Sequence, residues 1–251
     1  MKDNLVEKES NIILFLKKSS IVKKIWVVMS PWILRLFVVG KIKKFNTDSG
    51  EDALNFMQSL FFGFAIRLAQ VKSEFLELLH IFKDKSPKVV LEIGTARGGT
   101  LFCFSKLAPE DAVIISIDLP DGNFGGGYPK SKIPLYRSFK KKGQEMFLLR
   151  EDSHAEQTVQ KIKEILNGKK IDFLFIDADH TYEGVKRDFE LYSSLVANKG
   201  IISFHDVAFI PGASKTFVNA FWNEIKDSYK YKELIENTNQ GWAGIGVLFL
   251  N

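Results

Sequence analysis

The chain has 251 residues, 45% of them apolar, which is enough to bury one principal core. Its single cysteine, Cys103, excludes an internal disulfide framework, and we expect a reducing, cytoplasmic setting because no cleavable signal is recognisable. The net charge of +5 is unevenly distributed: residues 1–44 hold ten Lys/Arg and three Asp/Glu, a net of +7, which leaves −2 for residues 45–251. The basicity therefore belongs to an N-terminal arm, and we expect no nucleic-acid partner.

Apolar clusters alternate with lysine pairs in the arm, which also contains Trp26 and Trp32. The longest uncharged run, Ile25 to Leu34, is about half of the roughly 20 residues that a membrane-spanning helix needs, and Arg35 follows it. Lysines beside aromatic and aliphatic side chains are typical of a segment in an anionic membrane interface. We therefore expect peripheral contact with the inner face of a membrane through residues 11–44. Packing of the arm on its own domain or on a second subunit, in a homo-oligomer, is the alternative.

A polar, turn-rich stretch follows, in which Asp48 or Ser49 is a plausible helix N-cap. It predicts a boundary between a basic, apolar helical arm over residues 1–48 and a main domain over residues 49–251. Apolar residues then recur at helical spacing to about Phe82.

Short β-branched runs alternate with helical patterns in the rest of the chain. Strands are expected near residues 88–94, 112–120, 147–153, 171–179 and 200–207, and helices near residues 98–108, 156–166 and 182–196. This alternation predicts an α/β fold with a doubly wound, mostly parallel sheet, and the apolar strand centres indicate burial on both faces. The glycine-rich residues 121–134 predict a long loop of the kind that is functional or disordered.

All five of these predicted strands end in polar residues, together with a glycine in the first. They are Glu92 and Gly94, then Asp118, then Asp152 and Ser153, then Asp177, Asp179 and His180, and finally His205 and Asp206. Ligands of doubly wound sheets bind outside the carboxyl ends of the strands. Helix capping would explain any one of these groups, but it explains all five together poorly.

The turn after the first strand contains Gly94, Gly98 and Gly99, and such a turn permits close approach of the backbone to a ligand. Its spacing differs from the G-x-G-x-x-G of nicotinamide oxidoreductases, which argues against that class. Glu92 would repel a diphosphate and suits a cationic or amine-bearing ligand better. Asp118 ends the second strand, where a carboxylate commonly binds ribose hydroxyls.

Two of these strand ends also match local patterns with a different meaning from a ligand site. Ser153 and Glu156 have the spacing of a helix-capping box. Residues 177–181 match D-x-D-x-T, a phosphatase signature, although that motif normally ends the first strand of its domain and only 74 residues follow here. His80 and His154 have no partner that the sequence identifies.

The segments VLEIGTARGGT, ISID and IDFLFIDADHTYEGVKRDFELYSSLVANKGIISFHDV resemble class I S-adenosylmethionine-dependent methyltransferases. The similarity is to the branch with cephalosporin-hydroxylase-like and macrocin O-methyltransferase-like proteins, and it covers roughly residues 55–250. It implies a Rossmann-like methyltransferase fold with a seven-stranded sheet, closed by GWAGIGVLFL as an antiparallel strand.

The resemblance also implies roles for individual residues. Glu92, Gly94, Thr95 and Gly98 would shape the methionine end of the cofactor site, Asp118 would hold the ribose, and Asp152 and Ser153 would lie by the adenine. A divalent ion, Mg²⁺, would be bound by Asp177 and Asp206, with Asp177 also bordering the cofactor. His205 stands where relatives often carry a carboxylate, so either a histidine ligand or no ligand is allowed at that position. His180 would be the catalytic base.

These roles predict a metal-assisted O-methyltransferase that acts on a hydroxyl of a sugar or glycosylated metabolite, that is, on a small-molecule or glycan acceptor. A divalent cation on carboxylates would orient vicinal oxygens, and His180 would accept the hydroxyl proton. The alternative is a non-catalytic peripheral membrane module of a glycan-assembly complex that keeps a relict cofactor fold.

Overall fold

The structure is a computed structural model that describes residues 31–59, 66–120, 127–208, 217–237 and 239–251. The chain forms two compact units, Met1–Lys44 and Phe45–Asn251. Helix α3 (Pro31–Lys44) is the described part of the first unit, and its last turn carries Lys41, Lys43 and Lys44. No helix within the described ranges is long and apolar enough to cross a membrane. Most of the predicted membrane-contact segment lies outside the described residues, so that contact stays a prediction, as does the homo-oligomer.

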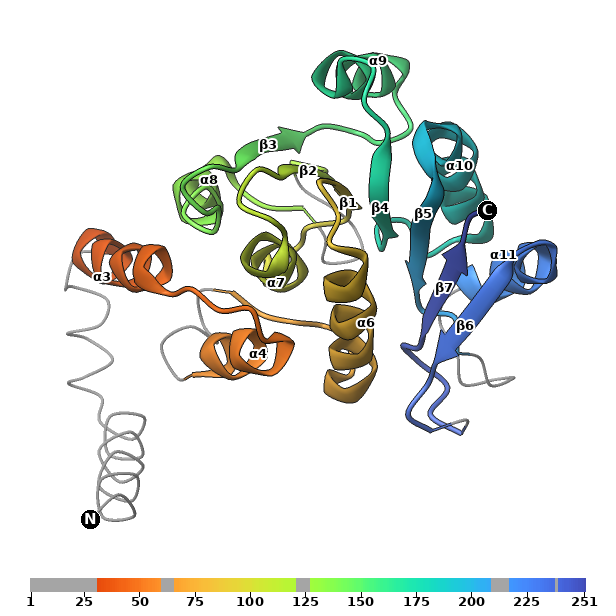
Figure 1. Ribbon diagram of the computed structural model, residues 1–251, viewed down its shortest axis with the longest axis horizontal. Coiled ribbons are helices and arrows are strands. Elements are labelled where there is room, and N and C mark those ends of the chain that lie inside the picture. The colour runs from red at the N-terminus through yellow and green to blue at the C-terminus, as the bar shows by residue number, and fades with distance from the viewer. Residues whose placement is uncertain (1–30, 60–65, 121–126, 209–216, 238) are drawn as a thin grey trace. The chain divides into compact units, whose positions relative to one another are not determined.

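The second unit is built on a sheet of seven strands in the order β3-β2-β1-β4-β5-β7-β6 (Figure 1). The strands are β1 (Val89–Ile93), β2 (Val113–Asp118), β3 (Glu145–Arg150), β4 (Ile171–Ile176), β5 (Val196–His205), β6 (Lys230–Leu234) and β7 (Ile245–Phe249). The first five are parallel, and β7 lies antiparallel between β5 and β6. The prediction of a seven-stranded, mostly parallel sheet with an antiparallel closing strand is therefore confirmed.

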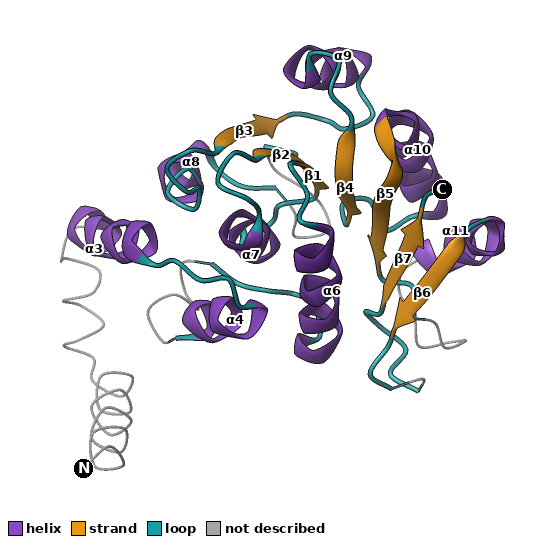
Figure 2. Cartoon of the chain, in the orientation of Figure 1, coloured by secondary structure: helices purple, strands orange, loops and turns teal. Residues whose placement is uncertain are grey.

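Helices cover both faces of this sheet. They are α4 (Gly50–Gln58), α6 (Lys72–Lys85), α7 (Gly99–Leu107), α8 (Ile133–Tyr136), α9 (Glu156–Leu166), α10 (Tyr182–Tyr192) and α11 (Val218–Ile225), with the 3-10 turns η1 (Lys130–Lys132), η2 (Ser193–Leu195) and η3 (Lys226–Ser228). Helices α6 and α7 lie on one face, and α9, α10 and α11 lie on the other (Figure 2). The helical pattern expected up to Phe82 is interrupted, because α4 ends at Gln58 and α6 begins at Lys72.

Each face of the sheet has its own apolar layer. On one face, Phe82 of α6 packs edge-on against Phe173 of β4, with ring centroids 4.9 Å apart, and Phe104 of α7 lies 5.6 Å from Phe175. On the other face, side chains of α9, α10 and α11 form a single core with the strands, including the fully buried Trp222. Every residue of β1 and β2 is buried, as the apolar runs predicted. The strand ends are thus held by packing from both sides.

Helix caps confirm one sequence prediction and correct another. Ser49 caps α4, because its side chain accepts a hydrogen bond from the backbone N–H of Asp52. The capping box predicted for Ser153 and Glu156 is wrong. Helix α9 begins at Glu156 after Ala155, with no side-chain cap, and the carbonyl of Ser153 instead accepts a 2.7 Å hydrogen bond from Tyr192 of α10.

The first turn after β1 depends on the absence of a side chain at Gly94. This residue has φ +97°, and a Cβ there would lie 2.0 Å from the carbonyl oxygen of Asp177 at the end of β4. The contact is fixed by two backbone hydrogen bonds, from Gly94 N to Ile117 O (2.9 Å) and from Asp177 N to Ile93 O (2.8 Å). The turn after β1 and the end of β4 can therefore lie in direct contact.

We expect Gly94→Ala to lower the free energy of unfolding by about 3 kcal/mol or more, since the new methyl group adds a clash with backbone to an unfavourable φ. Gly168→Ala is the matched control, because Gly168 also has a positive φ, +82°, but faces open space. The control should cost only about 1–2 kcal/mol. Urea unfolding of both variants checks this, and equal losses of stability would contradict the steric argument.

Candidate active site

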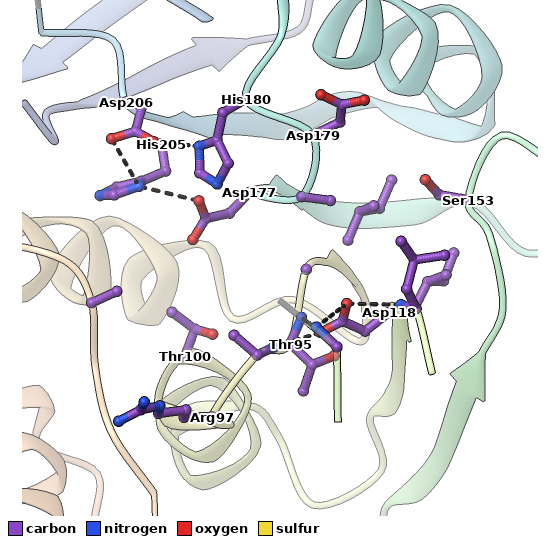
Figure 3. A pocket seen from close by; sticks show the side chains of 18 of the residues that line it. Thr95, Arg97, Thr100, Asp118, Ser153, Asp177, Asp179, His180, His205 and Asp206 are labelled. Carbon is purple, nitrogen blue, oxygen red and sulfur yellow. Dashed lines mark hydrogen bonds and ion pairs between the residues drawn. The ribbon is translucent and has the colours of Figure 1, made fainter. Parts of the chain in front are cut away.

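A cavity of about 810 Å³ opens at the carboxyl ends of the parallel strands. Nine of the eleven residues to which the resemblance assigned roles line it: Gly94, Thr95, Asp118, Asp152, Ser153, Asp177, His180, His205 and Asp206. In Figure 3, the Asp177, His180, His205 and Asp206 side chains gather at one end, Thr95 and Asp118 lie at another, and Ser153 borders a third side. Glu92 and Gly98 are not among the lining residues.

Glu92 lies beneath the cavity wall. Its carboxyl group is fully buried and accepts hydrogen bonds from the hydroxyls of Thr100 and Ser116, the second at 3.2 Å. Burial raises the pKa of Glu92 to about 8, because these two hydroxyls offset only part of the cost of an interior charge. Gly98 is also behind the wall, where a Cβ would meet the Tyr136 ring at 2.7 Å. Both residues support the turn that lines the cavity.

Asp118 joins the turn after β1 to the segment after β2. One carboxylate oxygen accepts backbone N–H groups of Thr95 (2.9 Å) and Ala96 (2.6 Å), and the other accepts those of Leu119 (2.8 Å) and Gly127 (2.9 Å). Burial raises the pKa of Asp118 although these four amides favour its charged form. The carboxylate therefore organises the backbone around this end of the cavity.

Two aspartates and two histidines form a connected cluster at the other end. His180 Nδ1 lies 2.5 Å from Asp206 Oδ2, and His205 Nδ1 lies 3.1 Å from Asp177 Oδ1 and 3.5 Å from Asp206 Oδ1. The second oxygen of Asp177 accepts a 2.6 Å hydrogen bond from the amide of Gln70. Asp206 adopts φ +63°, a strained backbone conformation for a residue with a side chain. Ion pairing and hydrogen bonding thus fix both carboxylates.

The protonation equilibria of the cluster are coupled. Burial disfavours the charged form of Asp206, but its bonds to His180 and His205 outweigh that effect and hold its pKa well below the usual range. The hydrogen bond to Asp206 raises the pKa of His180. Burial opposes the charge on His205, and the adjacent Asp177 and Asp206 carboxylates still raise its pKa to about 10. Positive and negative charges are therefore balanced within the cluster.

Asp177, His180 and Asp206 have one ligand atom each within 4.8 Å of the others, which suits a single cation. The two carboxylates suit a hard divalent ion such as Mg²⁺ or Mn²⁺, whereas an imidazole ligand is more typical of Zn²⁺. His205, the predicted third ligand, instead directs its Nδ1 toward the two carboxylates, and its buried Nε2 has no hydrogen-bond partner among the described residues. The side chains that converge here are therefore Asp177, Asp206 and His180, and the predicted ligand His205 is not among them.

Asp179 points away from this cluster (Figure 3). Its carboxylate accepts the backbone N–H of Thr181 at 2.9 Å, and Thr181 caps α10 by accepting a 3.0 Å hydrogen bond from Gly184 N. Asp179 therefore supports the start of the following helix, and Thr181 is the capping residue.

Three features of the site were not predicted from the sequence. Gln70, which lies just before α6, holds Asp177. Trp242 lines the cavity with 56% of its surface exposed. His154, for which the sequence suggested no partner, lies 3.3 Å from the buried carboxylate of Asp188. No sequence pattern assigned a role to these three side chains, so only the tertiary fold reveals their positions.

The raised pKa of Glu92 predicts a pH dependence of stability. An unfolded glutamate loses its proton near its ordinary pKa of 4.5, whereas the folded one keeps it up to about 8. Between these values the folded state binds more protons, so stability falls as pH rises, by up to about 1.4 kcal/mol per pH unit. Glu92→Gln should remove this contribution, and urea unfolding across the range checks it. Parallel profiles for the two proteins would refute the assignment.

Comparison with known proteins agrees with this geometry. Residues 91–207 match a family model described as "Methyltransferase domain". No curated protein is similar enough in sequence to count as a match.

Solved structures of methyltransferases share the fold. An O-methyltransferase from Bacillus cereus in complex with SAH superposes with a TM-score of 0.50 at 16% identity, over 82% of this chain and 92% of that one. The O-methyltransferase TomG from Streptomyces achromogenes, in complex with SAM, gives 0.52 at 15% identity, over 82% and 91%. Cofactor-bound Rv0187 from MTB gives 0.52 at 16% identity, over 82% and 99%. The chain therefore has the methyltransferase fold, and residues 91–207 within it match a methyltransferase domain, in agreement with the sequence resemblance.

Proposed function

We propose that the protein is a metal-assisted O-methyltransferase that acts on a hydroxyl of a sugar or glycosylated metabolite. The observation that carries the proposal is the cluster of Asp177, Asp206 and His180 on the wall of the cavity. A hydroxyl is a poor nucleophile until its proton is removed, and such a cluster offers both a cation site and a base. Two of the solved neighbours are titled O-methyltransferases, which agrees with oxygen as the acceptor atom.

S-adenosylmethionine supplies a methyl group on a sulfonium, which reacts when the acceptor oxygen is in line with the S–CH₃ bond. Gly94 and Thr95 would face its methionine part, where the missing Cβ of Gly94 leaves the turn close to Asp177. Asp152 and Ser153 would face the adenine. Because the two oxygens of Asp118 already accept four backbone bonds, the ribose can use this carboxylate only by replacing one, such as that from Gly127.

Asp177 and Asp206 would hold the divalent ion through their carboxylate oxygens. Such an ion acts as a Lewis acid that orients the acceptor oxygen and stabilises its developing negative charge. Gln70 and His205 fix the two oxygens of Asp177 in the structure, so they set the direction of this ligand.

His180 is proposed as the base. Its Nδ1 faces Asp206 at 2.5 Å, which fixes the ring, and a proton from the acceptor would go to Nε2. The carbonyl of His180 also accepts a 2.9 Å hydrogen bond from Phe217 N, which ties the backbone at this position to the start of α11. Hydrogen bonds to both its ring and its backbone therefore orient His180.

The position of Trp242 favours a ring-shaped acceptor. It lies on a turn where Gly241, Ala243 and Gly244 all have positive φ, and the buried Glu74 accepts the Gly244 N–H at 3.0 Å. This rigid turn presents a flat aromatic face at the cavity with 56% of the side chain exposed. An aromatic face of this kind suits stacking on the apolar face of a sugar ring or on another planar ring.

Asp206→Asn should lower turnover by roughly 10–100-fold while the Kd of SAH stays within about twofold, because the variant weakens the cation site and leaves the cofactor contacts intact. Asparagine tolerates the positive φ at this position. Turnover is measured by mass spectrometry, as the mass gain of one methyl group on nucleotide-linked or lipid-linked sugars. Asp227→Asn, at an exposed position in η3, is the control. Full activity of Asp206→Asn, together with full activity in EDTA, would rule out the metal.

His180→Ala distinguishes a base from a ligand. If His180 is the base, kcat falls and the Kd of Mn²⁺, measured by calorimetry in the presence of SAH, does not change. If it is a ligand, the Mn²⁺ Kd rises by roughly 10–100-fold. The proposal predicts the first result, and a large rise in the Mn²⁺ Kd would assign the imidazole to the metal instead.

A further inference from the structure

The side chain of Asp188 is a buried carboxylate on α10 that the reaction does not use. It has no exposed surface, and neither oxygen has a hydrogen-bond partner among the described residues. His154 Nε2, 3.3 Å from Oδ1, is at ion-pair distance without hydrogen-bond alignment. A buried carboxylate is costly unless a positive charge lies beside it, and Asp188 in turn raises the pKa of His154. Each side chain therefore stabilises the charged form of the other.

His154 belongs to the segment 151–155, which connects β3 to α9 and lines the cavity with Glu151, Asp152, Ser153 and His154. Within this segment the backbone N–H of His154 donates to Asp152 Oδ1 at 2.9 Å. His154 and Asp152 are thus bonded directly, and a shift of one moves the other.

Helix α10 holds this segment at two points. Tyr192 donates a 2.7 Å hydrogen bond to the carbonyl of Ser153, and Asp188 pairs with His154. Residues 188 and 192 are four positions apart, so they lie on the same face of the helix, one turn from each other. The carbonyl of Ser153 and the imidazole of His154 are therefore fixed by a single rigid element.

The pair is placed at a wall between two cavities. The His154 side chain keeps 28% of its surface exposed and borders both the main cavity and a second one of about 450 Å³ on the outer side of α10. Stability alone does not explain the pair, because apolar side chains of similar volume would stabilise this interior position at least as well. A charge pair at the cavity wall instead fixes the orientation of the groups next to it.

We propose that His154 is a positioning residue, whose ion pair with Asp188 holds Asp152 and Ser153 in the orientation that binds the adenosyl part of S-adenosylmethionine. This inference rests on the proposed placement of the adenine beside Asp152 and Ser153. His154 acts on the cofactor through this segment, with Asp188 and Tyr192 as its supports on α10.

Calorimetric titration of the full chain tests the pair, with SAH and 5′-methylthioadenosine as ligands. His154→Gln and Asp188→Asn should each raise the Kd of SAH about tenfold. The double variant should bind no more weakly than the weaker single variant, because it leaves no uncompensated buried charge. 5′-Methylthioadenosine lacks the amino-acid part, so its Kd should rise by the same factor. His80→Gln, an exposed histidine on α6, is the matched control and should bind as the wild type does.

Thermal unfolding of the same variants separates positioning from stability. A lowered unfolding temperature with an unchanged Kd of SAH would overturn the proposal, as would strictly additive losses of affinity or a loss seen with SAH and not with 5′-methylthioadenosine. If Asp188→Asn does not fold, His154→Gln alone decides, because His154 is partly exposed. The ratio of variant to wild-type affinity is independent of the acceptor, so this result and a failure to methylate sugars are distinguishable.

Discussion

The close contact between Gly94 and the carbonyl of Asp177 is the constraint on which the site depends. Strands β1 and β4 are neighbours in the sheet, with Ile93 opposite Ile176, so the chains leaving them meet immediately. A side chain at position 94 would separate them, because its Cβ would lie 2.0 Å from the Asp177 carbonyl oxygen. Their contact brings the turn that is bonded to Asp118 next to the strand end that carries Asp177. The Asp118 end and the Asp177 end of the cavity are therefore built from one junction.

Charge balance is the second constraint. The two carboxylates of the histidine–aspartate cluster are each bonded to a histidine: Asp177 to His205, and Asp206 to both His180 and His205. These bonds lower the pKa of Asp206 in spite of its burial, so it stays ionised. Asp206 does so in a left-handed backbone conformation, which is unfavourable for a residue with a side chain and is offset by its two histidine contacts. The cluster is thus oriented before any ligand binds.

The sequence predicted those parts of the molecule that follow from local pattern. Apolar runs located the five parallel strands, and the rule that parallel strand ends share one edge brought Asp118, Asp177 and Asp206 to a single cavity. Strand β6 was missed because four of its five residues are exposed, which leaves no apolar pattern to detect. The capping box failed because α9 begins only at Glu156, after Ala155, so Ser153 does not occupy the N-cap position. Gln70 was missed because its role depends entirely on where its segment packs.

We propose that S-adenosylmethionine binds in this one cavity, with its sulfonium between Asp118 and the histidine–aspartate cluster. A crystal structure of the chain with SAH tests it most directly. The account predicts adenosine density beside Asp152 and Ser153, and the thioether sulfur on the side of the cavity that faces His180. SAH bound elsewhere, or bound with its sulfur directed away from His180, would contradict the account.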